Sequence, residues 1–341
     1  MKNKILVTGG TGYIGSHTIL QILRNTSFEP ISIDNYSRSF ENTLDRIETI
    51  TGKRVKNYAV DLKDLEATER VFEENDDIVG IIHFAAYKSV GESVEEPIMY
   101  YDNNFGSLLN VLKCCVKYKV SNFIFSSSCS VYGNVEKLPV TEETPIQQTE
   151  SPYAHTKKVG EEMIQNFAHK YKEINTIPLR YFNPVGADVS GLNGENTPDK
   201  PNNLVPVITR TAIGLQESMM VFGDDYATRD GSCVRDYIHV LDIADAHILA
   251  MQYLLEGKNS SNFETFNLGT GNGVSVLEAI AAFEKASGTA LNYRLVARRP
   301  GDVEAIYSDS SKAKDILGWV PKYDINDMMS TAWTWQQELA K

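Results

Sequence analysis

Tyr153 and Lys157 stand four residues apart at the expected start of a helix, so their side chains share one face of it. A free phenol has a pKa near ~10 and is a poor base at neutral pH. A neighbouring ammonium group and a positively charged nicotinamide would both favour the phenolate and lower that pKa. Tyr153 is therefore a candidate proton acceptor from an alcohol that is being oxidised. An amphipathic helix surface is the alternative, because this spacing is common by chance.

Ser126, Ser127 and Ser128 follow an apolar run that ends at Phe125. Active-site groups of doubly wound sheets gather at the carboxyl ends of strands. A hydroxyl there can hold the alcohol or pass its proton to Tyr153. Helix capping or a solvated loop would explain the same serines without any chemistry.

A glycine-rich turn follows the first apolar run and places Gly9, Gly12 and Gly15 three residues apart. Each position disfavours a Cβ, because such a turn is tight, approaches a pyrophosphate closely and brings a helix hard against a sheet. The helix that starts here offers free N–H groups and a positive dipole end to phosphates. The pattern predicts a dinucleotide site, and an ordinary strand-to-helix turn is the alternative.

Asp34 follows the second apolar run, close to the ~20-residue offset expected of an acid that binds a ribose. A carboxylate there accepts a hydrogen bond from the 2′-OH and repels a 2′-phosphate, so NAD is favoured over NADP. Arg38, four residues on, is the one feature that weakens this preference.

Short β-branched runs alternate with helix-length segments through the first half of the chain. The runs cover residues 5–7, 31–33, 58–60, 78–84, 123–125 and 177–182, and the helical segments cover 14–25, 65–75, 98–118 and 153–171. Apolar strands that alternate with helices predict a parallel sheet covered on both faces, a doubly wound, Rossmann-like α/β fold. We expect a dinucleotide-binding domain over residues 1–182, to which the chain returns around 236–258, and a smaller α/β substrate domain mainly over 183–341.

Composition narrows the partners and the compartment. The 341 residues include 33 Lys+Arg and 45 Asp+Glu, a net charge of −12, which disfavours nucleic acid and anionic membranes as partners. The four cysteines form no C-x-x-C pair and the six histidines no H-E-x-x-H pattern, so no metal site is expected. The apolar run near the start, before Thr8 and Gly9, is too short for the core of a secretory leader, and no apolar run approaches the ~18 residues of a membrane span. We therefore expect a cytoplasmic protein.

The Gly-x-x-Gly-x-x-Gly spacing resembles the short-chain dehydrogenase/reductase superfamily, in its extended form because a second domain follows. The resemblance implies a catalytic triad of Ser128, Tyr153 and Lys157. Further motifs resemble the UDP-glucose 4-epimerase family, with matches from the first strand to near Trp333; they cover residues 91–94, 100–104, 125–128, 131–133, 151–153, 180–187, 201–204, 234–240 and 298–302.

That resemblance implies a reversible epimerisation at C4 of a UDP-hexose. Tyr153 would take the proton of the 4-OH while the C4 hydride passes to tightly bound NAD, and the 4-keto sugar would turn and take the hydride back on its other face. Lys157 would lower the tyrosine's pKa and Ser128 would shuttle the proton. Arg235 and Arg299 are the candidate clamps for the diphosphate, because guanidinium forks suit phosphate oxygens; neighbouring Arg298 is expected in a surface ion pair.

The resemblance also assigns binding positions. The expected cofactor contacts are Gly9, Gly12, Tyr13, Ile14, Gly15, Asp34, Asn35, Tyr36, Ser37, Arg38, Ser39, Asp61, Leu62, Phe84, Ala85, Ala86, Lys88, Asn103, Ser128, Tyr153, Lys157 and Phe182. The expected substrate contacts are Lys88, Ser128, Tyr153, Tyr181, Asn183, Asn203, Leu204, Val221, Phe222, Arg235, Tyr237, Arg299, Asp302 and Ile306.

Two other functions remain open. A nucleotide-sugar 4,6-dehydratase needs an acid/base pair beside the shuttle hydroxyl; dehydratases of this superfamily have Asp-Glu there, and this chain has Cys129 and Ser130. A cofactor-binding regulator without catalysis would commonly lack the tyrosine or the lysine. The resemblance implies that Ile306 occupies the position whose bulk limits a 2-N-acetyl group in these epimerases, and its intermediate size predicts UDP-glucose/UDP-galactose as the main pair with some N-acetyl activity. The family also implies a homodimer joined by a helix pair.

Overall fold

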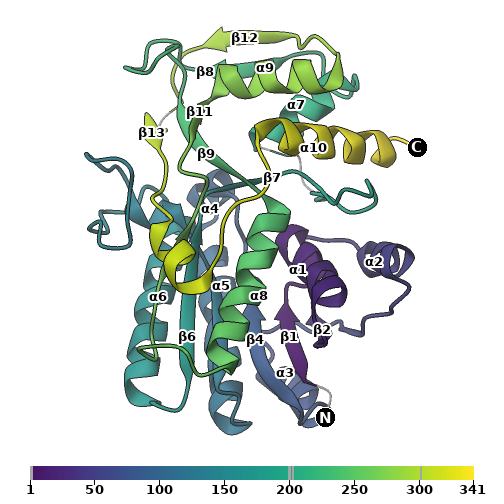
Figure 1. Cartoon of the computed structure of the whole chain (residues 1–341), viewed down its shortest axis with the longest axis vertical. Helices are drawn as coiled ribbons and strands as arrows, with labels where there is room; N and C mark the ends of the chain where they lie inside the picture. The colour runs from purple at the N-terminus through teal and green to yellow at the C-terminus, as the bar shows by residue number, and fades with distance from the viewer. Residues whose placement is uncertain (1–2, 199–200, 202, 300–301) are drawn as a thin grey trace.

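Seven short strands pair in parallel and form the central sheet of the lower lobe in Figure 1. The computed structural model describes residues 3–198, 201, 203–299 and 302–341. The strand order is β3-β2-β1-β4-β5-β6-β10. From β1 the chain adds β2 and β3 on one side and then crosses over to add β4, β5 and β6 on the other, so the order of the strands reverses between β1 and β4. The strands are β1 (Lys4–Thr8), β2 (Glu29–Ile33), β3 (Asn57–Tyr58), β4 (Ile78–His83), β5 (Asn122–Ser128), β6 (Asn175–Tyr181) and β10 (Phe266–Leu268). Ligands of such sheets bind at the carboxyl ends of the strands, beside the point of reversal.

Helices cover both faces of this sheet, because its strands are apolar on both sides. In β1, Ile5 and Val7 join one buried cluster, while Leu6 between them joins the other. One face carries α1 (Tyr13–Asn25), α2 (Thr43–Thr51) and α8 (Val240–Leu255); the other carries α3 (Leu65–Glu73), α5 (Pro97–Lys117) and α6 (Pro152–Lys170), and the short α4 (Val90–Glu95) packs on α5 and α6. The predicted doubly wound α/β fold is confirmed.

The sheet also recruits a segment from late in the sequence. Strand β10 pairs in parallel with β6, Phe266 opposite Leu179, and closes the edge of the sheet. The sequence analysis placed these residues in the substrate region, because three residues are too few for a periodic signal. Helix α8 follows β9 directly and carries the chain from the upper lobe back onto the sheet (Figure 1).

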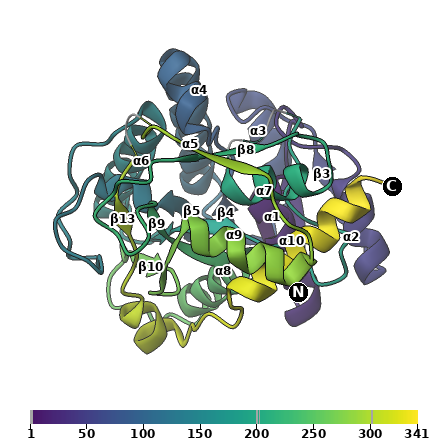
Figure 2. The same ribbon diagram turned by 90° about the horizontal axis from the view of Figure 1, so that it is seen from above.

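The upper lobe is smaller and built around mixed sheets. Strand β9 (Val234–His239) lies between β11 (Gly273–Ser275) and β13 (Ala305–Ile306) and also pairs with β7 (Asn183–Val185); β8 (Met219–Phe222) pairs with β12 (Tyr293–Val296). Seen from above, α9 (Val276–Ser287) and α10 (Ile325–Leu339) lie side by side, with α7 (Leu204–Ala212) near them (Figure 2).

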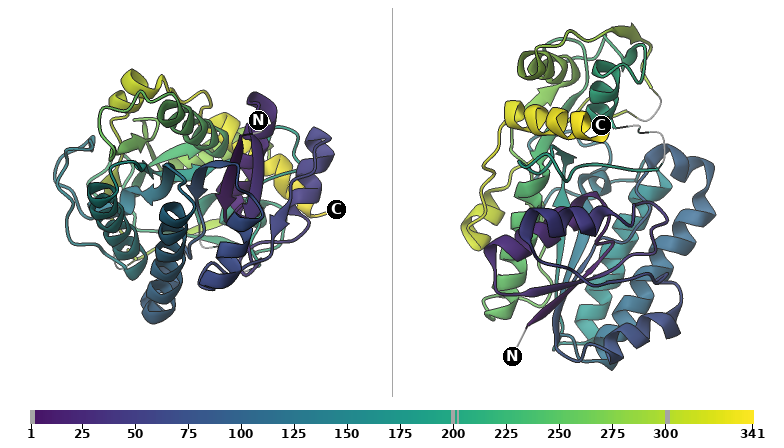
Figure 3. Two further views of the ribbon diagram at one scale, coloured as in Figure 1. Left: turned by 90° about the horizontal axis from the view of Figure 1, so that it is seen from below. Right: turned by 90° about the vertical axis from the view of Figure 1, so that its right-hand side faces the viewer.

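Helix α10 also lies where the two lobes meet, as the side view in Figure 3 shows. There the Arg46 guanidinium of α2 stacks 4.8 Å above the Trp335 ring of α10. Within the described ranges, no helix is long and apolar enough to cross a membrane.

Candidate active site

The glycine turn has the shape that a bound pyrophosphate requires. Gly9 adopts a φ of 69°, and a Cβ there would lie 2.8 Å from the backbone nitrogen of Ala85. A Cβ at Gly15 would overlap the carbonyl oxygen of Gly9. Helix α1 is capped by Gly12, which has no side chain to bond the first N–H groups, and its first turn carries no acid. These N–H groups remain available to an anion, so the turn fits a dinucleotide.

Asp34 lies beside this turn, and three hydrogen bonds hold its carboxylate. The backbone nitrogens of Thr11 (3.1 Å) and Tyr36 (2.9 Å) and the hydroxyl of Ser39 (3.0 Å) donate to it. Arg38 points elsewhere: its guanidinium pairs with Glu92 at 2.7 Å and stacks above the Tyr87 ring. The carboxylate, rather than the guanidinium, is therefore fixed where a ribose is expected.

The end of β4 completes the dinucleotide side. The backbone nitrogens of Phe84 and Ala85 donate to the carbonyl and hydroxyl oxygens of Thr8, which joins the predicted 84–86 segment to the turn. Asn104 was not predicted, yet its amide fixes the next residues by bonding Tyr87 N at 2.8 Å and Tyr87 O at 3.1 Å. The predicted neighbour Asn103 donates to Asn104 instead. Burial of Asn104 was the missing signal, and it is invisible in the sequence.

The three candidate catalytic residues meet at the carboxyl end of β5. Ser151 caps α6 by accepting a hydrogen bond from Ala154 N, so Tyr153 lies in the first turn and Lys157 in the second. Ser128, the last residue of β5, lies beside the Tyr153 phenol and lowers its pKa. The Lys157 ammonium donates to the carbonyl oxygen of Ser126 at 2.6 Å and lies 6.0 Å from the Tyr153 ring.

Desolvation dominates the protonation of this pair. Burial raises the pKa of Tyr153 to about 12, and the neighbouring Ser128 hydroxyl opposes that rise. Burial also lowers the pKa of Lys157 to about 7. This cost of burial is invisible in the sequence, from which only the charges that favour the phenolate can be inferred. Proton abstraction by Tyr153 at neutral pH thus requires the further positive charge that an oxidised nicotinamide would supply.

Two arginines of the upper lobe converge on one carboxylate. Arg299 binds Asp302 at 2.8 Å and stacks on the Phe222 ring, and Arg235 approaches Asp302 to 3.6 Å. Arg298 instead pairs with Asp225 at 2.7 Å on the surface. The two guanidinium groups predicted to hold a diphosphate therefore lie together.

The other predicted substrate positions lie at the end of β6 and on several elements of the upper lobe. Asn183 on β7 lies opposite Tyr237 on β9, and Ile306 on β13 lies opposite Arg235. Ile306 is buried in a cluster that includes Tyr132 and Phe182. The remaining positions are Tyr181 at the end of β6, Leu204 at the start of α7 and buried Val221 on β8; Asn202, Pro300 and Gly301 of the quoted motifs lie outside the described residues.

Glu195 joins two predicted ligand-binding residues from opposite lobes. Its Oε1 accepts from the Lys88 ammonium at 2.8 Å and from the Asn203 amide at 3.2 Å. The Trp335 indole of α10 donates to the Glu195 carbonyl at 2.8 Å. Sequence reasoning missed Glu195, because its partners lie far along the chain and no motif flags it.

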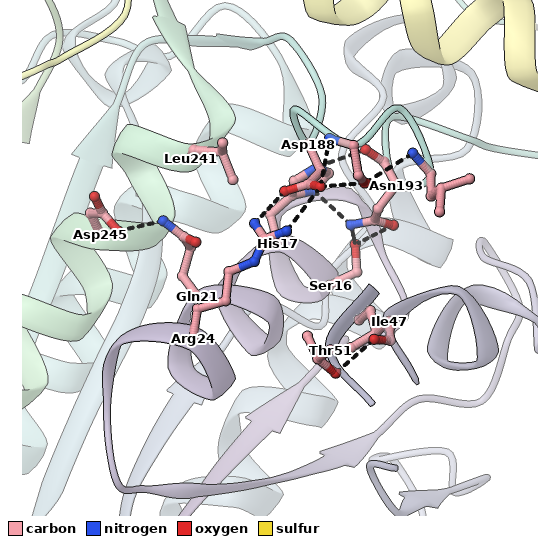
Figure 4. Close-up of polar contacts among 12 residues, drawn as sticks. Ser16, His17, Gln21, Arg24, Ile47, Thr51, Asp188, Asn193, Leu241 and Asp245 are labelled. Carbon is pink, nitrogen blue, oxygen red and sulfur yellow. Dashed lines mark hydrogen bonds and ion pairs between the residues drawn. The ribbon is translucent and has the colours of Figure 1, made fainter. Parts of the chain in front are cut away.

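Residues 188–195, part of the loop between β7 and α7, lie along helix α1, where Figure 4 labels Asp188 and Asn193. Arg24 forms two hydrogen bonds with Asp188, at 2.5 and 3.2 Å. Two turns closer to the glycines, His17 Nε2 lies 3.2 Å from the Asn193 carbonyl, and the Asn193 amide donates to Ser16 Oγ at 3.1 Å. The helix expected to hold the pyrophosphate therefore also holds the loop of the upper lobe.

The histidine, cysteine and acidic side chains do not assemble a metal centre. Across the part of the chain that the structure describes, no group of three or more of them could hold a metal ion. The Cys129 thiol beside Ser128 is half-buried, and desolvation raises its pKa to about 12.

Known proteins match this chain over nearly its full length. A family model described as GDP-mannose 4,6 dehydratase matches residues 6–332. UDP-glucose 4-epimerase of Bacillus subtilis is 46% identical over 97% of this chain and 96% of its own. The crystal structure of UDP-glucose 4-epimerase from Bifidobacterium longum with NAD+ and UDP has a TM-score of 0.93 at 46% identity, covering 98% of each chain. The enzyme from Stenotrophomonas maltophila, with bound NAD and formylated UDP-arabinopyranose, has a TM-score of 0.95 at 40% identity, covering 99% of this chain and 98% of that one.

Fold and site together define an extended short-chain dehydrogenase/reductase, with a dinucleotide turn on the sheet and a second lobe facing it. This confirms the class that the glycine spacing predicted. Within that class, the chain belongs to the UDP-glucose 4-epimerase family.

Proposed function

We propose that this protein interconverts UDP-glucose and UDP-galactose by epimerisation at C4, with NAD held in the site. The observation that carries the proposal is the meeting of Ser128, Tyr153 and Lys157 at the same edge of the sheet as the glycine turn, in a chain 46% identical to a UDP-glucose 4-epimerase. When bound, NAD would accept the C4 hydride of the sugar and return it to the opposite face of the same carbon.

The chain's own residues would move the proton. Tyr153 would accept the proton of the sugar 4-OH and later return it. Ser128, which lies beside Tyr153, would hold the same hydroxyl or pass on its proton. The Lys157 ammonium would stabilise the phenolate, and its bond to the Ser126 carbonyl fixes its position.

Binding energy would come from the nucleotide rather than from the sugar, because the 4-keto sugar must turn within the site. Arg235 and Arg299 would hold the diphosphate, exchanging part of their contact with Asp302 for phosphate oxygens. Phe222, under Arg299, would contact the uracil. Ile306 would border the hexose.

A 4,6-dehydratase is less well supported, although the matching family model carries that description. Dehydration must remove a C5 proton and protonate a leaving hydroxyl. The two side chains after Ser128 are poor at both tasks: burial raises the pKa of the Cys129 thiol to about 12, and Ser130 Oγ has no hydrogen-bond partner among the described residues.

The decisive experiment is an assay of the purified protein with UDP-galactose, alongside Tyr153→Phe. We expect conversion to UDP-glucose without added reductant, and a loss of about 10²- to 10⁴-fold in kcat for the variant. A 4-keto-6-deoxy product would identify a dehydratase. Full NAD content without turnover would favour a regulator, and a variant as fast as the parent would exclude Tyr153 as the base.

We also propose the division of the chain expected above, residues 1–182 and about 236–258 for the dinucleotide and mainly 183–341 for the substrate. Strand β10 supports extending the return to residue 268. A cytoplasmic location is proposed too, and it fits the four cysteines, all of which are free.

A homodimer joined through α5 and α6 is the proposed assembly. Ile98 at the start of α5 is 81% exposed; Val94 on α4 and Leu109, about three turns further along α5, are exposed as well. On the same pair of helices, Tyr101 stacks on Phe105. We expect Ile98→Asp to yield monomers in analytical ultracentrifugation. Leu215→Asp, which charges an exposed leucine of the upper lobe, is the matched control and should leave the dimer intact; monomers in both, or in neither, contradict the assignment.

A further inference from the structure

A buried ion pair lies behind the three candidate catalytic residues. The Arg180 guanidinium of β6 contacts both carboxylate oxygens of Glu161 on α6, with Nε at 2.9 and 3.2 Å and Nη2 at 2.6 Å. The two residues are only 6% and 4% exposed. Nothing in the proposed proton transfer uses either residue.

This pair holds the backbone on both sides of Ser128. Before it, the Ser127 hydroxyl donates to Glu161. After it, Arg180 Nη1 donates to the Tyr132 hydroxyl at 3.0 Å, and Tyr132 ends the short 3₁₀ turn that starts at Cys129. Ser127, before Ser128 in the sequence, and Tyr132, after it, are therefore both hydrogen-bonded to the same ion pair.

The pair also belongs to the helix that carries the tyrosine and the lysine. Glu161 follows Lys157 by one helical turn and Tyr153 by two, so all three share one face of α6. Glu161 raises the pKa of Lys157 against the burial that lowers it. Strand β5, which carries Ser128, thus contacts Glu161 through Ser127. Helix α6, which carries Tyr153 and Lys157, includes Glu161 itself.

Stability alone does not account for this arrangement. Desolvating two charges costs several kcal/mol per ion, and well-packed apolar residues often replace such a pair without loss. What apolar residues cannot supply is the directional set of bonds to Ser127 and Tyr132. Misplacing a catalytic group by ~1 Å can cost about 10²-fold in rate.

We propose that Glu161 and Arg180 are positioning residues, which set the distance between Ser128 on β5 and Tyr153 on α6 through Ser127 and Tyr132. This inference rests on the proposed epimerase function and deepens it. It assigns the middle serine of the 126–128 run to the scaffold and only the last one to the chemistry.

Two mild variants test it without breaking the ion pair. Ser127→Ala removes the anchor before Ser128, and Tyr132→Phe removes the one after it. We expect each to lower kcat for UDP-galactose by about tenfold or more, while KM, UDP binding by calorimetry and bound NAD stay within about twofold. Tyr253→Phe is the matched control: it removes a buried tyrosine hydroxyl that donates to Glu264 at 3.1 Å, far from the site, and should keep kcat.

A third variant, Glu161→Gln, should lower kcat most, and its folding is checked by circular dichroism and NAD content. A kcat within twofold of the parent in both Ser127→Ala and Tyr132→Phe overturns the proposal, as does an equal loss in Tyr253→Phe. An inactive parent would instead contradict the epimerase function, so the two failures are distinguishable.

Discussion

Arg24 and Asp188 form a two-pronged ion pair between helix α1 of the dinucleotide lobe and residues 188–195 of the loop between β7 and α7. The Asp188 side chain is fully buried, whereas that of Arg24 is 30% exposed. The pair lies on the helix whose first turn faces the expected pyrophosphate, and on the 188–195 segment, whose last residue contacts Lys88 and Asn203. One helix therefore aligns the cofactor side and the substrate side.

Arg24→Met should destabilise the protein, because it leaves the Asp188 carboxylate buried with fewer partners. Removal of one member of a buried pair costs about 3–5 kcal/mol, and the partial exposure of Arg24 reduces this to about 2–3 kcal/mol. Urea unfolding at pH 7.5 measures the loss.

The control for this variant is Arg70→Met, which breaks a surface pair with Glu66 one helical turn away. Such exposed pairs contribute about 0.3–0.5 kcal/mol. Adding Asp188→Asn to Arg24→Met should restore part of the stability, since the unpaired charge is gone. Equal losses for Arg24→Met and Arg70→Met would contradict the role assigned to the buried pair.

Asp34→Ala should weaken the retention of NAD by about tenfold to a hundredfold, the value of one or two hydrogen bonds to a charged acceptor. The same variant should bind NADP better than the parent does, because the carboxylate no longer repels a 2′-phosphate. Both affinities can be measured by fluorescence titration after the endogenous nucleotide is removed. A decrease in both would indicate a collapsed turn rather than lost discrimination.

Acid should destabilise the protein through its buried histidines. Burial lowers the pKa of His17, and it lowers those of His83 and His239 to about 3 and of His247 to about 4. Below pH ~6.5 the unfolded chain binds protons that the folded one refuses, so this stability is fully present above 6.5 and is lost as the pH falls toward 4. Each histidine contributes about 1.4 kcal/mol per pH unit.

Two carboxyl groups oppose this trend: burial raises the pKa of Asp242 to about 6 and also raises the pKa of Glu142, and both shifts favour the folded state as the pH falls. His247→Met isolates one histidine, because its Nε2 has no partner among the described residues. Between pH 6 and 5, the variant's unfolding free energy should fall by about 1.4 kcal/mol less than the parent's. The exposed His169→Gln should match the parent, and an unchanged slope in His247→Met would refute the assignment.

Ile306 should control whether a 2-N-acetyl group fits. Ile306→Tyr should lower kcat/KM for UDP-N-acetylglucosamine by at least about tenfold relative to UDP-glucose, and Ile306→Val should raise that ratio modestly. In both variants the new side chain would occupy the place of Ile306 in the apolar cluster that contains Phe182. If the ratio follows neither substitution, another residue limits the sugar.

The parallel sheet, the glycine turn and the order of the candidate catalytic residues could be predicted because each depends on local periodicity or fixed spacing. Gly9 and Gly15 lie where no Cβ fits, and the presence of glycine at both positions indicates this restriction in the sequence. Likewise, a capping serine before Pro152 places Tyr153 and Lys157 on one face of α6.

Pairings between distant segments could not be predicted in this way. Glu161 and Arg180 are each ordinary in the sequence, and only the packing of α6 on β6 makes them a buried pair. The contacts of Glu195 with Lys88 depend likewise on how the lobes meet. Desolvation, which moves the pKa of Lys157 to about 7, is a property of the packed structure as well.

Strand β10 has a consequence for synthesis on the ribosome. Its partner β6 ends at Tyr181, and β10 starts only at Phe266, so β6 remains an open edge while the whole upper-lobe segment between them is translated. Open edges pair readily with other chains. Nascent or truncated forms that stop before Phe266 should therefore depend on chaperones. Once β10 has been made and pairs with β6, this edge of the sheet is covered.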